Sequence, residues 1–364
     1  MGQNNEIPDK GQEKLITILF IFIIFFILLF LPFIPGIIEL LKPRDAAPLF
    51  INKNYTKDPR YFGKSFRYII ENALSTGDLS SGVRKVKLSK NEDVEIAPYK
   101  KIYAGKEGDN VFYITGDFVS TEKARFNKEI YVKGDAVIGS ENTLRALACT
   151  GKVLISEKSN IIRWVDGEKG VDIGIKCNLG ISISSGGILR ISKHCSFKRL
   201  YGLPIITTSN INSPIRVEET DNNDESFESR KKIEEISDIS WVIDEKQAVI
   251  PPFARIEGDF IVRKGLTMKE NCVLNGSIKT YGDLIIGKDV KVSGNLFSEG
   301  NIEIGEGTLV MGNIFSQGTV HIRERVKIGS AEKFKSVIGK KGIVLEQNVI
   351  IYGYIMTEGT GTIL

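Results

Sequence analysis

The sequence predicts an all-β protein: a triangular parallel β-helix that repeats about every 18 positions, one turn per repeat, preceded by one transmembrane α-helix. Three observations predict this fold class. Aliphatic residues recur every six positions, glycines recur every 18 positions, and one long uncharged run lies near the N-terminus. The chain has 364 residues with 36 glycines and 42% hydrophobic residues, which is typical of a folded protein with many tight turns.

The last third of the chain carries the clearest repeat. Two series, each taken at every sixth residue, contain almost only aliphatic or small side chains: Leu284, Val290, Leu296, Ile302, Thr308, Ile314, Val320 and Val326, and Ile286, Val292, Ser298, Ile304, Val310, Ser316, Ile322 and Ile328. The series are offset by two positions, the spacing of side chains on one face of a β-strand. Short strands separated by tight bends explain this pattern, whereas a helix requires a 3.6-residue period.

A second, longer period is superimposed on the six-residue repeat. Glycines recur at every 18th position in two sets: Gly258, Gly276, Gly294 and Gly312, and Gly282, Gly300 and Gly318. Three six-residue sides per turn predict a triangular solenoid, in which glycine at a corner supplies backbone angles that other residues avoid. A looser array is expected in the middle of the chain, where Gly116, Gly134, Gly151, Gly170 and Gly187 recur at a similar spacing.

Leu15–Ile38 is a continuous apolar run without a charge. A bilayer core requires about 20 apolar residues of helix, which this run exceeds, and no small-x-small cleavage site follows it. We therefore expect a transmembrane helix. Basic residues beyond it predict a single-pass inner-membrane protein whose C-terminal solenoid lies in the cytoplasm.

The segment after the predicted helix mixes basic and aromatic residues. We expect five of its basic side chains to contact the anionic membrane surface: Lys42, Arg44, Lys53, Lys57 and Arg60. A short helix is expected at Ser65–Leu74, ended by Gly77.

These patterns divide the chain into six segments. They are a tail (1–14), the transmembrane helix (15–38), a basic and aromatic connector (39–98), an irregular solenoid (99–216), an acidic loop or linker (217–240) and a regular solenoid (241–364). The four cysteines, Cys149, Cys177, Cys195 and Cys272, lack metal-site spacing, so we expect free thiols in the core. Cys177 and Cys195 are separated by one full repeat and are expected in adjacent turns.

The segment GDLIIGKDVKVSGNLFSEGNIEIGEGTLVMGNIFSQGTVHIRERVKIG, residues 282–329, resembles the bactofilin family of bacterial polymer-forming cytoskeletal proteins. The resemblance covers about residues 256–364, and residues 111–203 more loosely. It implies a right-handed β-helix whose units assemble end to end without nucleotide, often at a membrane. The chain differs from typical members in its two arrays, its apolar N-terminal run and its short C-terminal tail.

The alternative is a hexapeptide-repeat acyltransferase, which also has three six-residue sides per turn but on a left-handed β-helix. The general preference for right-handed crossovers disfavours it. Such an enzyme commonly uses a histidine as general base, and this chain has two, His194 and His321. His321 is expected to point outward without a clear acid partner, although Glu303, one repeat earlier, is a candidate neighbour.

The sequence therefore predicts a membrane-anchored, bactofilin-like scaffold that is not an enzyme. It is expected to position envelope or cell-shape proteins, with membrane lipid and copies of itself as further partners, and to have no nucleic acid partner, cofactor, metal or catalytic residue. Because the chain stops inside the repeat, its last turn is expected to expose an open edge for self-association. The residues of that edge are Ile351, Ile355, Ile363 and Leu364.

Overall fold

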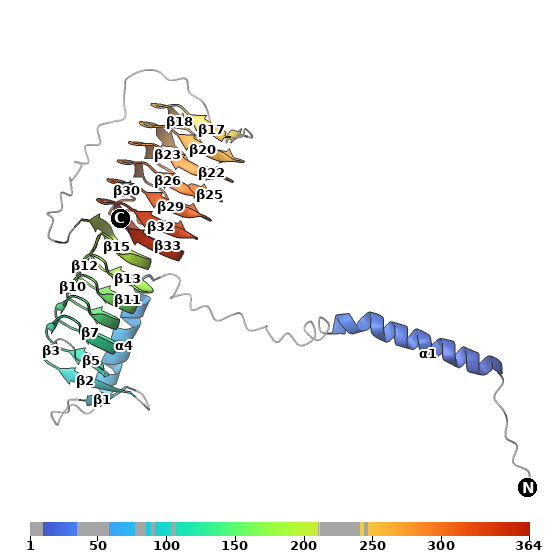
Figure 1. The fold of residues 1–364 in the computed structure, drawn as a ribbon, viewed down its shortest axis with the longest axis horizontal. Helices are drawn as coiled ribbons and strands as arrows, with labels where there is room; N and C mark the ends of the chain where they lie inside the picture. Colours follow the sequence, from blue (N-terminus) through green and yellow to red (C-terminus); the bar gives the residue numbers. More distant parts are fainter. Residues whose placement is uncertain are drawn as a thin grey trace, which may run out of the picture. The chain divides into compact units, whose positions relative to one another are not determined.

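The computed structural model describes residues 10–34, 58–76, 85–88, 92–102, 107–108, 110–209, 211, 241–243 and 247–364. The chain divides into two compact units, Met1–Lys57 and Asp58–Leu364 (Figure 1). The first unit contains helix α1 (Lys10–Phe30) and a 3-10 helix, η1 (Leu31–Phe33). The second unit contains helix α4 (Tyr61–Thr76) and all the strands.

The transmembrane helix predicted for Leu15–Ile38 is wrong. Among the described residues, no helix combines the length and the apolar character needed to cross a membrane. α1 ends at Phe30, directly before η1 and its Pro32. Its uncharged part, from Leu15 to Phe30, gives about 24 Å of helix against a hydrocarbon core of about 30 Å.

The predicted membrane location is also unsupported, because it required that helix. A single-pass inner-membrane protein with a cytoplasmic solenoid was inferred from the apolar run and its basic flank, and the first premise is lost. The short helix expected at Ser65–Leu74 is confirmed, because α4 covers it.

The second unit contains two β-solenoid arrays. Array 1 comprises β1 (Lys85–Lys87), β2 (Asp93–Ala97), β3 (Lys100–Ile102), β4 (Glu107–Gly108), β5 (Val111–Ile114), β6 (Phe118–Ser120), β7 (Arg125–Val132), β8 (Ala136–Ile138), β9 (Thr143–Cys149), β10 (Lys152–Ile155), β11 (Asn160–Gly167), β12 (Gly170–Ile173), β13 (Ser182–Ser185), β14 (Ile188–Ser192) and β15 (Ser196–Thr208). Its parallel stacking thus begins with β2, inside the segment assigned to the connector.

Array 2 comprises β16 (Trp241–Ile243), β17 (Gln247–Ile250), β18 (Arg255–Glu257), β19 (Phe260–Val262), β20 (Gly265–Met268), β21 (Val273–Asn275), β22 (Ile278–Thr280), β23 (Leu284–Ile286), β24 (Lys291–Val292), β25 (Leu296–Ser298), β26 (Ile302–Ile304), β27 (Leu309–Val310), β28 (Ile314–Ser316), β29 (Thr319–Ile322), β30 (Lys327–Ile328), β31 (Lys335–Gly339), β32 (Gly342–Leu345) and β33 (Ile350–Ile363). Three consecutive strands make one turn, or rung, and contribute one strand to each of three faces. Each strand pairs in parallel with the strand three positions later, for example β23 with β26 and β26 with β29.

The predicted parallel solenoid with an 18-residue repeat is confirmed. Leu284 pairs with Ile302 and Ile302 with Val320, so the register advances by one full repeat per rung. Every member of both six-residue series is at most 1% exposed. One insertion interrupts the register between β30 and β31, where additional residues enter the rung and Ile314 pairs with Val337.

The recurring glycines have a different cause from the one expected. A Cβ at Gly294 or Gly312 would lie closer than 3.0 Å to the backbone oxygen of the glycine one rung earlier. Positive φ angles instead occur once per rung at another corner, which polar residues mostly occupy: Asn271, Asp289, Gly307, Arg325 and Asn348. Apart from Gly258, whose φ is 107°, the recurring glycines of array 2 therefore permit close stacking of backbones rather than a left-handed turn.

Helix α4 covers the outer side of one face of array 1, formed by β5, β13 and the C-terminal halves of β7, β9 and β11. Its apolar stripe, Phe62, Phe66, Ile70 and Leu74, repeats every four residues and packs on this face. Ala146 and Ala148 leave room for the helix, and Tyr131 and Trp164 flank it. We call this face, and its continuation into array 2 along β19, β22, β25, β28 and β31, face 1.

Candidate functional site

The two arrays meet end to end at a single junction. β15 of array 1 pairs antiparallel with β33 of array 2, with Leu200 opposite Ile355 and Ile205 opposite Ile351. β33 also pairs in parallel with β30, β31 and β32, so it closes array 2 on one side and contacts array 1 on the other. The last rung of each array therefore lies at the junction (Figure 1).

The C-terminal edge expected to be open is occupied by β15 of the same chain. Ile351 and Ile355 are fully buried and Ile363 is 1% exposed, whereas Leu364 lies at the margin with half of its surface exposed. The amide of Ile363 donates to the carbonyl of Cys195 at 3.0 Å. The premise that this edge is free for another copy is thus wrong.

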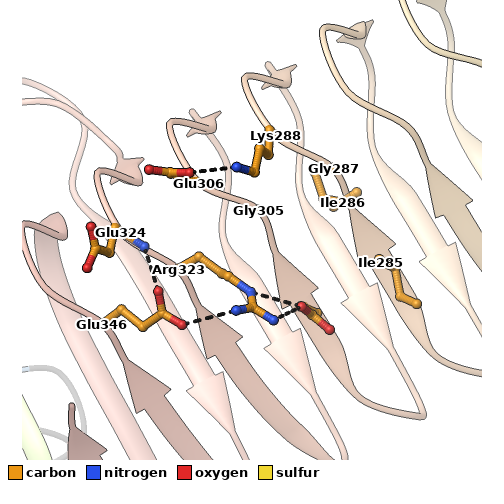
Figure 2. Close-up of a pocket in the computed structure, with 10 residues that line it drawn as sticks. Ile285, Ile286, Gly287, Lys288, Gly305, Glu306, Arg323, Glu324 and Glu346 are labelled. Atoms are coloured by element: carbon orange, nitrogen blue, oxygen red, sulfur yellow. Dashed lines mark hydrogen bonds and ion pairs between the residues drawn. The ribbon is translucent and has the colours of Figure 1, made fainter.

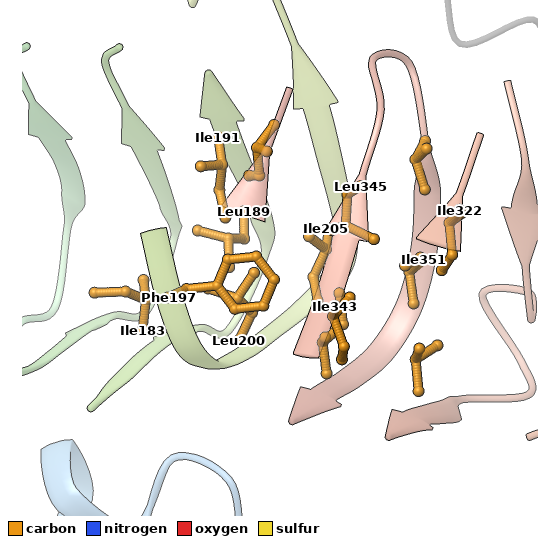
Figure 3. Close-up of a cluster of buried hydrophobic side chains, with 14 of the residues drawn as sticks. Ile183, Leu189, Ile191, Phe197, Leu200, Ile205, Ile322, Ile343, Leu345 and Ile351 are labelled. Carbon is orange, nitrogen blue, oxygen red and sulfur yellow. The ribbon is translucent and has the colours of Figure 1, made fainter. Parts of the chain in front are cut away.

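The junction joins the two hydrophobic cores into one (Figure 3). Phe197 of β15 lies over Gly361 of β33, where a Cβ would collide with its ring. Leu189, Leu200 and Ile205 from array 1 lie in the same buried cluster as Ile343 and Leu345 from array 2. This contact is hard to predict from the sequence, because the residues of β15 and β33 follow the same pattern as those of the other strands.

Arg60, predicted to contact the membrane surface, is instead held in an ion cluster at the N-terminal end of α4. Its Nε and Nη2 donate to Asp166 Oδ1 and Oδ2 at 2.8 and 2.9 Å. Burial acts to lower the pKa of Arg60, but the hydrogen bonds and charge of Asp166 outweigh it and raise that pKa above its ordinary value. The other four predicted contacts, Lys42, Arg44, Lys53 and Lys57, lie outside the described residues.

Asp166 is the centre of this cluster and is 1% exposed. Arg67 Nη2 donates to Asp166 Oδ2 at 2.6 Å and to the Cys149 carbonyl at 2.9 Å, and Ser184 Oγ donates to Asp166 Oδ1 at 2.6 Å. Gly63 permits the close approach, because a Cβ there would overlap the Asp166 side chain. Sequence reasoning missed this cluster. The signal was available in the small outward residues Ala146 and Ala148, which mark a covered face.

A charged hollow of about 440 Å³ lies on the outer side of array 2 (Figure 2). Arg323 donates to Glu303 Oε1 from Nε at 3.0 Å and from Nη2 at 2.7 Å, and its Nη1 lies 3.4 Å from Glu346 Oε1. The hydrogen bond to Glu303 raises the pKa of Arg323. Opposite charges from neighbouring rungs thus neutralise one another along this face.

A second pair of contacts borders the same hollow. Lys288 donates to Glu306 Oε2 at 2.9 Å, and Arg325 Nη2 lies 2.7 Å from Glu306 Oε1. The hydrogen bond from Lys288 and the charge of Arg325 lower the pKa of Glu306. The residues that line the hollow include no serine, threonine, cysteine or histidine, so the lining itself offers no nucleophile of those types.

His321 does have an acid partner, contrary to expectation. Its Nε2 lies 3.1 Å from Glu346 Oε1, and its side chain is about one-third exposed. Glu303 is the register neighbour of His321, as expected, but its carboxylate is bound by Arg323. His194, the other candidate base, is exposed at a positive-φ corner of array 1.

All four cysteines are free and buried, as predicted. Cys177 and Cys195 do lie in adjacent rungs, where the amide of Cys177 donates to Cys195 Sγ at 3.4 Å. No group of three or more potential metal-ligating side chains was found among the described residues.

The outer ends of the two arrays differ. On array 1, β1 pairs antiparallel with β2 and places Lys85 and Lys87 beside Val86, a way of blunting a sheet edge. On array 2, the first-rung strands β16, β17 and β18 each pair only with the following rung among the described residues.

Searches against protein-family models, curated proteins and solved structures found no match for this chain. The bactofilin resemblance therefore stays a resemblance, and the chain is assigned to no family.

Proposed function

We propose that this protein is a non-enzymatic, bactofilin-like scaffold that associates with a second copy of itself through the first rung of array 2. The observation that carries the proposal is the junction between β15 and β33. It is a case, inside one chain, of two solenoid ends that pair through their backbones and merge their cores. The same physics favours pairing at another solenoid end whose edge is unpaired.

The first rung of array 2 is the better candidate end. Ala248 and Ile250 of β17 point into the core, while Val249 points outward and is 57% exposed. The outer end of array 1 offers less, because β1 already covers β2 and, of its described strands, only β3 and β4 pair with the following rung alone. Pairing of this end with the same end of a second copy gives a closed, two-fold pair in which each copy uses the same surface.

The test compares two lysine substitutions on neighbouring residues of β17. Ile250→Lys places a charge in the core side of the end rung, where a second copy would enclose it. Val249→Lys places the same charge on the outer side. We expect the wild type and Val249→Lys to sediment as a two-copy species, and Ile250→Lys to sediment as a single copy.

Folding of both variants is checked by circular dichroism and thermal unfolding. An end-rung lysine can extend into water in the single copy, so Ile250→Lys should keep its β-sheet spectrum. A wild type that remains a single copy at high concentration rules out the proposal. Equal association of both variants shows that another surface is used.

The acyltransferase alternative rests on one observation, the His321–Glu346 contact. A glutamate that orients a histidine is one arrangement of a general base. Against it, Glu346 is also close to Arg323. The alternative predicts that an acyl thioester raises the melting temperature and that His321→Ala abolishes the effect. The scaffold proposal predicts no such shift.

A further inference from the structure

Face 1 of array 2 carries an apolar ridge on its outer side. One outward column of the register runs across successive strands: Lys279, Phe297, Phe315, Ile338 and Met356. Phe297 and Phe315 stack with ring centroids 5.2 Å apart and an interplanar angle of 7°. The column continues beyond Lys279 to Ile261 of β19. The ridge as defined here is uncharged apart from Lys279, and each of its five members is half-buried.

This ridge continues the face that α4 covers in array 1. In array 1 the face holds Trp164, against which Phe62 stacks at 6.4 Å and Phe66 packs edge-on at 5.7 Å. Across the junction, Arg199 pairs with Met356 and Tyr201 with Tyr354, so the two parts of face 1 form one continuous sheet. Among the described residues of the second unit, α4 packs on array 1 and no helix packs on the array 2 part.

The geometry of the sheet suits a helix laid across the strands. Neighbouring strands lie about 4.8 Å apart, and one helical turn rises about 5.4 Å. A helix with apolar residues at every third or fourth position therefore meets about one rung per turn. α4 shows this fit in the same sheet, with Phe62, Phe66 and Ile70 at four-residue spacing.

The charge of Lys279 indicates which side chain the helix should carry beside it. Lys279 Nζ lies 4.9 Å from the ring centroid of Tyr281 and 5.5 Å from that of Phe297. An ammonium above aromatic rings can also bind a carboxylate that approaches from solvent. In array 1 the signs are reversed, because α4 supplies Arg67 and the sheet supplies Asp166.

We propose that face 1 of array 2 binds an amphipathic helix of a partner protein, with an apolar stripe on Phe297, Phe315 and Ile338 and an acidic residue beside Lys279. The site is continuous with an interface that the chain already forms with its own α4, and its charge is complementary to an acidic helix. A scaffold with such a face holds a second protein without any catalytic step. The proposal does not require self-association.

The test uses the full chain and two labelled peptides. One peptide has the sequence of residues 60–76, and the other has the same sequence with Arg67→Glu. Fluorescence anisotropy measures binding. We expect the Arg67→Glu peptide to bind, and binding to weaken at least about ten-fold on Phe315→Ser because the apolar contact is lost. Ile285→Ser, an outward residue of β23 on a different face, is the matched control and should leave binding unchanged.

A charge reversal distinguishes the proposed ion pair at Lys279 from non-specific apolar binding. Lys279→Glu should reverse the preference, so that the peptide with native Arg67 binds more tightly than the Arg67→Glu peptide. Thermal unfolding should show that Phe315→Ser and Ile285→Ser cost similar stability. Ile250→Lys, which blocks the proposed self-association, should leave peptide binding unchanged.

Three results overturn the proposal. The first is that neither peptide binds. The second is that Phe315→Ser and Ile285→Ser behave alike, which places the peptide elsewhere. The third is that Phe315→Ser converts a two-copy species to a single copy in sedimentation, which makes a second copy the occupant of the ridge.

Discussion

Leu200 of β15 and Ile355 of β33 lie directly opposite each other in an antiparallel strand pair, although the rungs within each array stack in parallel. Both side chains are fully buried. The two residues belong to different arrays and are distant in sequence, yet they share one core. The contact thus closes the core at the end rung of each array.

Substitution Ile355→Lys should therefore destabilise the whole second unit. The sequence alone suggested an exposed end rung, where a lysine would spare the single copy. In the junction the ammonium is enclosed from both sides, and we expect a loss of at least about 3 kcal/mol in the free energy of unfolding. Urea denaturation measures it, with the outward neighbour Met356→Lys as the control. Equal stability of the two variants would show that the junction does not form.

Asp166→Asn should release the N-terminal end of α4. The substitution leaves the positive charges of Arg60 and Arg67 without their carboxylate, and breaking a buried pair costs about 3–5 kcal/mol. Hydrogen exchange should increase across Tyr61–Ile70, and Glu168→Gln, at the exposed rim, should change it little. Unchanged protection of α4 would mean that the apolar stripe alone holds the helix.

Gly312→Ala tests whether rung stacking depends on close backbone contact. A Cβ at this position would overlap the Gly294 carbonyl, whereas the nearest atom to a Cβ at Gly342 is 3.2 Å away. We expect Gly312→Ala to lower the unfolding free energy by roughly 2–4 kcal/mol, and Gly342→Ala by much less. Thermal and urea unfolding provide the comparison. Similar losses would argue that backbone entropy, not crowding, explains the glycines.

Cys149 should make stability depend on alkaline pH. Burial raises its pKa from 9.0 to about 12, so the folded state retains a proton that the unfolded state loses. The resulting contribution of the Cys149 thiol to the free energy of unfolding is fully present below about pH 9. It is lost as the pH rises toward 12, at about 1.4 kcal/mol per pH unit. Cys149→Ser does not titrate in this range. Urea unfolding at about pH 8 and about pH 10.5 should show a steeper loss for the wild type than for Cys149→Ser, and parallel losses would contradict the burial of this thiol.

The repeat could be predicted from the sequence because it is local. The alternation that places Leu284 and Ile286 inward needs only strand geometry, and the step from one rung to the next follows from the same pattern. The membrane helix could not be judged in this way, since the run at Leu15 does not show where α1 ends.

The contacts that position the candidate sites were not predictable, because their partners are distant in sequence. In the sequence Arg60 resembles a surface cation, because its partner Asp166 is 106 residues later in the chain. The insertion after β30 lengthens that rung, so His321 stacks on Val344 rather than on a residue 18 positions later, and the spacing of 25 residues to Glu346 does not follow the regular repeat. Charge and spacing identify candidate site residues, whereas the stacking of the rungs determines which of these residues lie in contact.

The order of synthesis gives the junction a further consequence. β15 emerges from the ribosome before any strand of array 2, and translation proceeds at about 5–20 residues per second. Its edge, with Phe197 and Leu200, therefore lacks β33 for on the order of 10 seconds. During this interval the last strand of array 1 has an unpaired edge, which β33 later covers. Nascent chains on one polysome should thus be most prone to mispairing while array 2 is being made, and a chaperone that shields β15 would act in this interval.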